Sequence, residues 1–113
     1  LGRDARAATT TDADAGIDYD VERFASFGVG ADGRKYRLDA ARLEHYPADG
    51  GARLHRPRIV QYDLTGATRR IRADSGWLRN DGAEAILTGN VHVHENAAAA
   101  SVARSQRMLI RLK

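Results

Sequence analysis

Four turn-forming dipeptides divide this chain at nearly equal intervals: Asp32-Gly33, Asp49-Gly50, Thr65-Gly66 and Asp81-Gly82. Glycine adopts positive φ without steric cost, and a preceding Asp supports a tight turn, so such dipeptides are typical of hairpins. The runs between them alternate apolar and polar residues, which is the period of a strand with one buried face. The pattern predicts long antiparallel strands joined by short turns, and it favours a binding surface over a catalytic pocket.

The composition limits the size and the partners of such a sheet. A chain of 113 residues is enough for one domain. Hydrophobic residues make up 42% of it but aromatic residues only 6%, so we expect a thin, mostly aliphatic core and a sheet folded over on itself. The net charge of +3 comes from basic residues scattered among acids, which argues against nucleic-acid binding and permits contact with anionic lipid headgroups.

The N-terminal residues differ in character from the rest of the chain. Residues 1–16 are small and polar, without the apolar stretch of a signal peptide, so we expect a disordered leader or a cloning remnant. The domain itself is expected over residues 17–113. No apolar run approaches the ~20 residues that a membrane-spanning helix needs, and the absence of cysteine excludes disulfides and thiolate metal sites.

Alternation within the strands predicts which side chains face inward. A change of phase after residues 18–22 makes Phe24 the next inward residue, which indicates a β-bulge near Arg23. The small residues Ala85 and Gly89 share the inward parity, which would leave space between the folded parts of the sheet. The interior is therefore either an ordinary packed core or a groove that accepts acyl chains. The predicted lipid-facing residues are Phe24, Tyr36, Leu38, Ala40, Leu54, Ile59, Ile71, Ala73, Trp77, Leu87, Val91 and Val93.

One alternative is an enzyme of the cupin type. His92, His94 and Glu95 lie close together on one predicted strand, and residues two apart share a face, so two imidazoles could hold one metal ion. A further ligand would have to come from His45 or His55, which lie near a turn and beside a proline. Because both strand histidines have the parity opposite to the apolar one, we expect them to face solvent, with no metal bound. A carbohydrate-binding or assembly module of sandwich type is a third possibility.

Four segments in order carry a resemblance to a known family. Residues 17–47 (IDYDVERFASFGVGADGRKYRLDAARLEHYP), 56–63 (RPRIVQYD), 71–77 (IRADSGW) and 87–93 (LTGNVHV) resemble the periplasmic domain of the LptC family. The last two are similar to the repeat that LptC shares with LptA and the N-terminal domain of LptD. The resemblance covers nearly all of the chain after residue 16.

The resemblance implies an open antiparallel β-jellyroll whose apolar interior shelters the acyl chains of lipid A. It implies a non-enzymatic protein without cofactors, which receives lipopolysaccharide from an inner-membrane ABC transporter and passes it to LptA in the periplasm. The family's N-terminal membrane anchor is not in this sequence, and its further C-terminal strands would follow Lys113, so the jellyroll is expected to be truncated there. An edge left open could pair two copies into a homodimer. Tyr19 and Val21, on the N-terminal strand, are the residues expected to contact the transporter.

Overall fold

The chain forms an all-β antiparallel fold, as predicted. The computed structural model describes residues 17, 19–30, 32–79, 81–96 and 101–113, without the side chains of residues 101 and 102. The expected leader over residues 1–16 lies outside these ranges. Every strand pairing within them is antiparallel. The described strands are β2 (Tyr19–Val29), β3 (Lys35–Tyr46), β4 (Gly51–His55), β5 (Arg58–Tyr62), β6 (Thr68–Arg72), β7 (Ser75–Arg79), β8 (Glu84–Asn96) and β9 (Ser101–Arg111).

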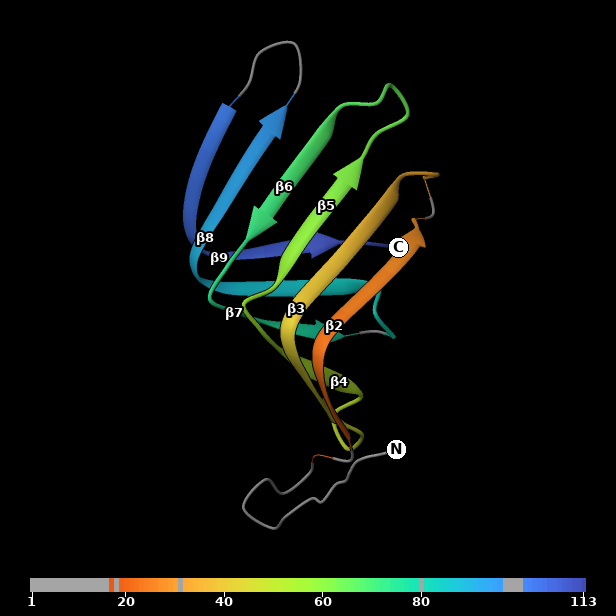
Figure 1. Cartoon of the computed structure of the whole chain (residues 1–113), viewed down its shortest axis with the longest axis vertical. Helices are drawn as coiled ribbons and strands as arrows, with labels where there is room; N and C mark the ends of the chain where they lie inside the picture. The colour runs from red at the N-terminus through yellow and green to blue at the C-terminus, as the bar shows by residue number, and fades with distance from the viewer. Residues whose placement is uncertain (1–16, 18, 31, 80, 97–100) are drawn as a thin grey trace.

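These strands make one sheet that is folded into two halves (Figure 1). The long strands β2, β3, β8 and β9 run through both halves. In the first half-sheet, β4 and β7 lie between β3 and β8. In the second half-sheet, β5 and β6 lie between the same two strands. Each half therefore holds six strand segments, in the order β2-β3-β4-β7-β8-β9 or β2-β3-β5-β6-β8-β9, and the fold is an open jellyroll.

The fold line between the halves is marked by left-handed backbone. Arg23 in β2, Arg56 between β4 and β5, and Asn90 in β8 have φ values of 54°, 53° and 50°. The predicted change of phase at Arg23 is present, because Val21 pairs with the buried Leu43 whereas Phe24, three residues later, pairs with the buried Ala40. It is not a bulge with an extra residue, since both strands advance by three residues between these pairs. A true bulge occurs in β8, which has one residue more than β9 between Thr88 and Val91.

Backbone hydrogen bonds join the corners along this line. The amide of Arg56 donates to the carbonyl of Asp74 at 2.9 Å, and the amide of Ala73 donates to the carbonyl of Pro57 at 3.2 Å. The amide of Asp74 in turn donates to the carbonyl of Gly89 at 2.9 Å. Backbone groups that leave the strand ladders at the corner are thus still paired, as buried amides and carbonyls require.

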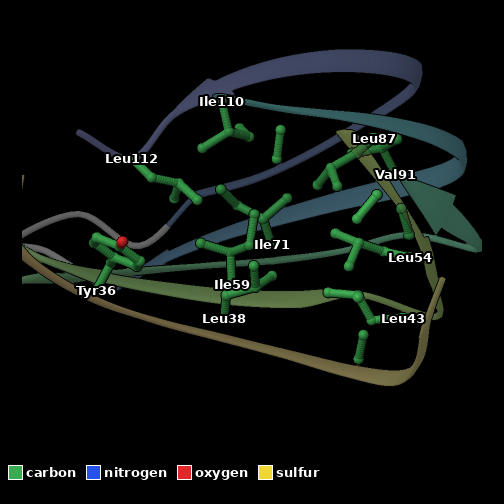
Figure 2. Packing of buried hydrophobic residues seen from close by; sticks show 14 of the residues in the cluster. Tyr36, Leu38, Leu43, Leu54, Ile59, Ile71, Leu87, Val91, Ile110 and Leu112 are labelled. Carbon is green, nitrogen blue, oxygen red and sulfur yellow. The ribbon is translucent and has the colours of Figure 1, made fainter. Parts of the chain in front are cut away.

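The core lies between the inner faces of the two half-sheets (Figure 2). Leu54 and Leu87 come from the first half-sheet, and Ile59 and Ile71 from the second. Leu54, Ile59 and Leu87 are fully buried. Burying one such side chain contributes about 1.5–3 kcal/mol, so apolar contact between the halves, more than any polar tie, holds the fold closed.

Candidate functional site

The interior between the half-sheets contains nearly all of the residues predicted to face lipid. Phe24 packs half-buried against the core. Ten others are themselves members of the core, and all of them are less than a tenth exposed. They are Tyr36, Leu38, Ala40, Leu54, Ile59, Ile71, Ala73, Leu87, Val91 and Val93.

Trp77 is the exception, and its predicted inward position is wrong. The prediction continued the alternation of Ile71 and Ala73 into β7, but the chain turns the corner between these strands. As a result Gly76 and Leu78 point inward, and Trp77 lies on the outer face opposite Arg53. Its ring covers Gly51, where a Cβ would approach ring atom Cζ2 to 2.5 Å, and lies 5.7 Å from the ring of Tyr46.

Several interior residues were missed by the sequence reasoning. Met108, Ile110 and Leu112 alternate on β9 and its end, so this pattern was visible in the sequence. Leu43 was obscured by the change of phase in β3 near Ala41. Ala85 was predicted to face inward, and the interior residues that were not predicted are Leu43, Ala52, Leu78, Met108, Ile110 and Leu112.

Small inner residues are covered by the fold, since Ala40, Ala52 and Ala85 are at most 5% exposed. The side where the half-sheets open, which we call the mouth, has accessible space that reaches inward as far as Leu38 and Ala52. A cleft of about 350 Å³ is present there, and its lining includes Tyr19, Phe24, Tyr36, His45 and Leu112.

The C-terminal residues close the mouth. The amide of Leu112 donates to the carbonyl of Ala83 at 2.7 Å, which holds the end of the chain to the first half-sheet. The side-chain amide of Gln61, from the second half-sheet, donates to the carbonyl of Arg111 at 3.2 Å. Tyr36 and Leu112 are both buried here, and Figure 2 shows them on facing sides of the interior.

Tyr19 and Val21, the residues expected to contact the transporter, lie on β2, an outer strand of the described sheet. Among the described strands β2 pairs with β3 alone and β9 with β8 alone, so these two are the outer strands of the described sheet. The side chains of Tyr19 and Val21 share the parity of Leu43 and project toward the mouth side of the first half-sheet. The ring of Tyr19 stacks on that of His45, with centroids 4.6 Å apart.

The strand histidines are surrounded by basic residues. His92 pairs with Arg72, and His94 pairs with Arg70, on the outer face of the second half-sheet. His55 lies on the first half-sheet, where its Nε2 is 2.8 Å from the Glu44 carboxylate. Across the part of the chain that the structure describes, no three potential metal ligands gather. The fold therefore gives His92 and His94 no third ligand within those ranges.

A family model described as "Lipopolysaccharide-assembly, LptC-related" matches residues 3–113. The chain belongs to the LptC family. A comparison with curated protein sequences finds no match. The family match confirms the resemblance seen in the sequence and gives this LptC-family chain its general role, which is that of a component of lipopolysaccharide transport.

The LptC family is a periplasmic-facing transport component and is not known as an enzyme family. Within the described residues of this member, no helix is long and apolar enough to cross a bilayer.

Proposed function

We propose that this LptC-family chain carries lipopolysaccharide by sheltering the acyl chains of lipid A between its two half-sheets. The observation that supports this most is the pair of facing apolar inner faces, which meet at a mouth closed by a few side chains. Each methylene that moves from water into such an interior gains about 0.8 kcal/mol. No catalytic residue or cofactor is needed for this task.

The acyl chains enter at the mouth in this proposal. The innermost side chains, such as Leu54, are fully buried, so the half-sheets must part before lipid can reach them. Parting at the mouth removes the Gln61–Arg111 hydrogen bond and the packing of Leu112, whereas parting at the fold line would break the ladders of four long strands. Acyl chains that replace Leu112 and Tyr36 would restore the lost apolar contact.

The outer strands β2 and β9 of the described sheet are the proposed contacts with the neighbouring proteins of the pathway. An exposed strand edge accepts a strand of another protein through backbone hydrogen bonds. We assign the β2 edge, with Tyr19 and Val21, to the inner-membrane ABC transporter, and the β9 edge to LptA. Jellyrolls joined in this way form one continuous groove across the periplasm. Pairing of two copies through β9 would instead give a homodimer, and light scattering of the purified chain separates the two cases.

Site-specific photocrosslinking with purified lipopolysaccharide tests the proposal. A photoreactive phenylalanine analogue is placed at Leu38, Leu87 or Leu112 in the interior, and at Arg53 or Arg107 on the outer face of the first half-sheet. The interior positions are expected to label lipopolysaccharide and the outer positions are not. Equal labelling of both sets would contradict an interior site.

A further inference from the structure

The outer face of the second half-sheet places basic residues directly opposite one another. Arg58 on β5 pairs with Arg72 on β6, Arg72 pairs with His92 on β8, and His92 pairs with Arg104 on β9. Like charges at directly opposed positions of a sheet destabilise it, and Arg58 and Arg72 are such a pair. Arg58 also lies opposite Asp39 on β3, whereas the other strand neighbour of Arg72 is His92, which is also the residue opposite Arg104. An anionic ligand would therefore relieve the repulsion within this row.

A second row beside it has the same character. Arg37 pairs with Val60, Val60 with Arg70, and Arg70 with His94. Among the described residues of this face the only carboxylate is Asp39, which is already bound to Arg37 at 2.9 Å. The basic side chains border a hollow of about 730 Å³ on this face. We call this surface the cationic face; it contains Lys35, Arg37, Arg58, Arg70, Arg72, Arg104, His92 and His94.

The outer face of the first half-sheet provides an internal comparison. There Arg42 forms a forked hydrogen bond with Asp20 across β2 and β3, and Arg79 bonds Glu84 at 2.9 Å across β7 and β8. Arg42 also lies 3.7 Å from Glu44, which is directly opposite Asp20, so one arginine bridges two acids on this half-sheet. On the outer face of the second half-sheet, the basic residues outnumber the one carboxylate among the described residues. The chain's modest net charge of +3 conceals this separation.

Exposed apolar residues lie beside the cationic face, at the turn end of the second half-sheet. Phe27 is 71% exposed and Leu64 is 80% exposed. Val29 and Tyr62, which lie opposite Lys35 on its two sides, are also exposed. The ring of Phe27 lies 5.2 Å from the guanidinium of Arg37, so the apolar group borders the basic one. Gly33 lies in the turn between β2 and β3, and Leu64 lies in the turn between β5 and β6. A Cβ on Gly33 would lie 3.7 Å from the Leu64 side chain, so these two turns are in contact.

We propose that the cationic face binds the anionic surface of a phospholipid bilayer, with Phe27, Val29 and Leu64 entering the headgroup region. Basic residues near an anionic membrane each contribute about 1 kcal/mol of attraction, and adjacent apolar side chains add buried area in the interface. A soluble polyanion such as a nucleic acid would use the charges but leave this apolar border exposed. Lipopolysaccharide held in the interior would emerge at the mouth, whereas the cationic face points away from it.

Vesicle sedimentation tests the proposal without lipopolysaccharide, so its result is independent of the proposed function. The purified chain is mixed with vesicles of phosphatidylcholine alone or with about 30% phosphatidylglycerol. We expect binding to the anionic vesicles only, weakened by 0.5 M NaCl because salt screens exposed charges. Substituting Arg58→Gln, Arg72→Gln and Arg104→Gln together should weaken binding about 100-fold.

A matched triple variant controls for net charge. Arg53→Gln, Arg107→Gln and Arg111→Gln remove the same charge from the first half-sheet and should leave the affinity within about fivefold. Phe27→Ser with Leu64→Ser should weaken vesicle binding but not retention on heparin. Circular dichroism confirms that each variant is folded. Equal losses for the two triple variants, no binding to anionic vesicles, or parallel changes on vesicles and heparin would each overturn the proposal.

Discussion

Asp74 and Gly89 lie in direct contact at the fold line, where a Cβ on Gly89 would lie 2.9 Å from Oδ2 of Asp74. The amide of Asp74 donates to the carbonyl of Gly89, and the side-chain amide of Asn90 donates to the same carboxylate at 2.8 Å. This contact joins the corner between β6 and β7 to the bulge of β8. Gly89 was expected to point into the groove, and that expectation was wrong, because its missing side chain faces an exposed aspartate.

Gly89→Ala should therefore lower the stability of the fold. Gly89 has a φ of 81°, which costs a residue with a Cβ about 1–2 kcal/mol, and the Cβ would also displace Asp74. Gly50→Ala is the control, because Gly50 has a φ of 65° with no atom within 4 Å of its Cβ position. We expect Gly89→Ala to cost at least about 1 kcal/mol more than Gly50→Ala in urea denaturation. Equal costs would mean that the contact with Asp74 carries no constraint.

Neighbouring residues on β5 test which face of the second half-sheet is the inner one. Ile59 is fully buried and Val60 lies half-buried on the cationic face. Ile59→Ala should cost about 2–5 kcal/mol because it opens a cavity in the core. Val60→Ala should cost less than about 1 kcal/mol. Thermal denaturation of the two variants gives the comparison, and similar losses would contradict the inward assignment of Ile59.

Gly28 provides the space in which the ring of Tyr36 covers the mouth. A Cβ on Gly28 would lie 2.5 Å from atoms of this ring, and no positive φ is involved, so the effect of a substitution is steric. Gly28→Ala should push the ring aside and cost about 1–3 kcal/mol. Fluorine NMR of 3-fluorotyrosine at Tyr36 should then show a changed chemical shift. Ser26→Ala, on the same strand and face, should leave this signal in place.

The turn between β5 and β6 should make a contribution to stability that depends on pH. The pKa of Asp63 is lowered, first by its hydrogen bond from the Thr65 hydroxyl at 2.7 Å and also by the amides of Thr65 and Ala67. Because its pKa is lower in the folded state, the ionised Asp63 carboxylate stabilises the fold, and this stabilisation is fully present above the unfolded-state pKa, near 3.9. The stabilisation is lost as the pH falls through the lower folded-state pKa.

The measurement compares the wild-type chain with Asp63→Asn, which keeps an acceptor oxygen but does not titrate. Wild-type stability should decrease more steeply than that of the variant below about pH 4. An NMR titration of the Asp63 carboxyl should give a pKa below the ordinary value for aspartate. An unshifted titration, or identical slopes for the two proteins, would contradict the role of this turn.

Alternation predicted the inner face correctly along the part of β3 that lies in the second half-sheet. Tyr36, Leu38 and Ala40 are all buried, because period two is a local consequence of extended backbone. At two corners the alternation did not carry over. Trp77 lies beyond the turn at Asp74, and Leu43 beyond the phase change near Ala41. Both errors have the same cause: a change in backbone direction reverses parity, and the side chains give little sign of it.

The amino-acid sequence by itself determined the all-β character, the position of the turns, most of the inner residues and the resemblance to the LptC family. These depend on local backbone preference and on the order of segments along the chain. Only the tertiary structure decided where the sheet folds, how Leu112 closes the mouth, and that Arg58, Arg72 and Arg104 share one row. Those arginines are far apart in the sequence, so their repulsion arises from strand register, which is fixed only when the two half-sheets bury their inner faces.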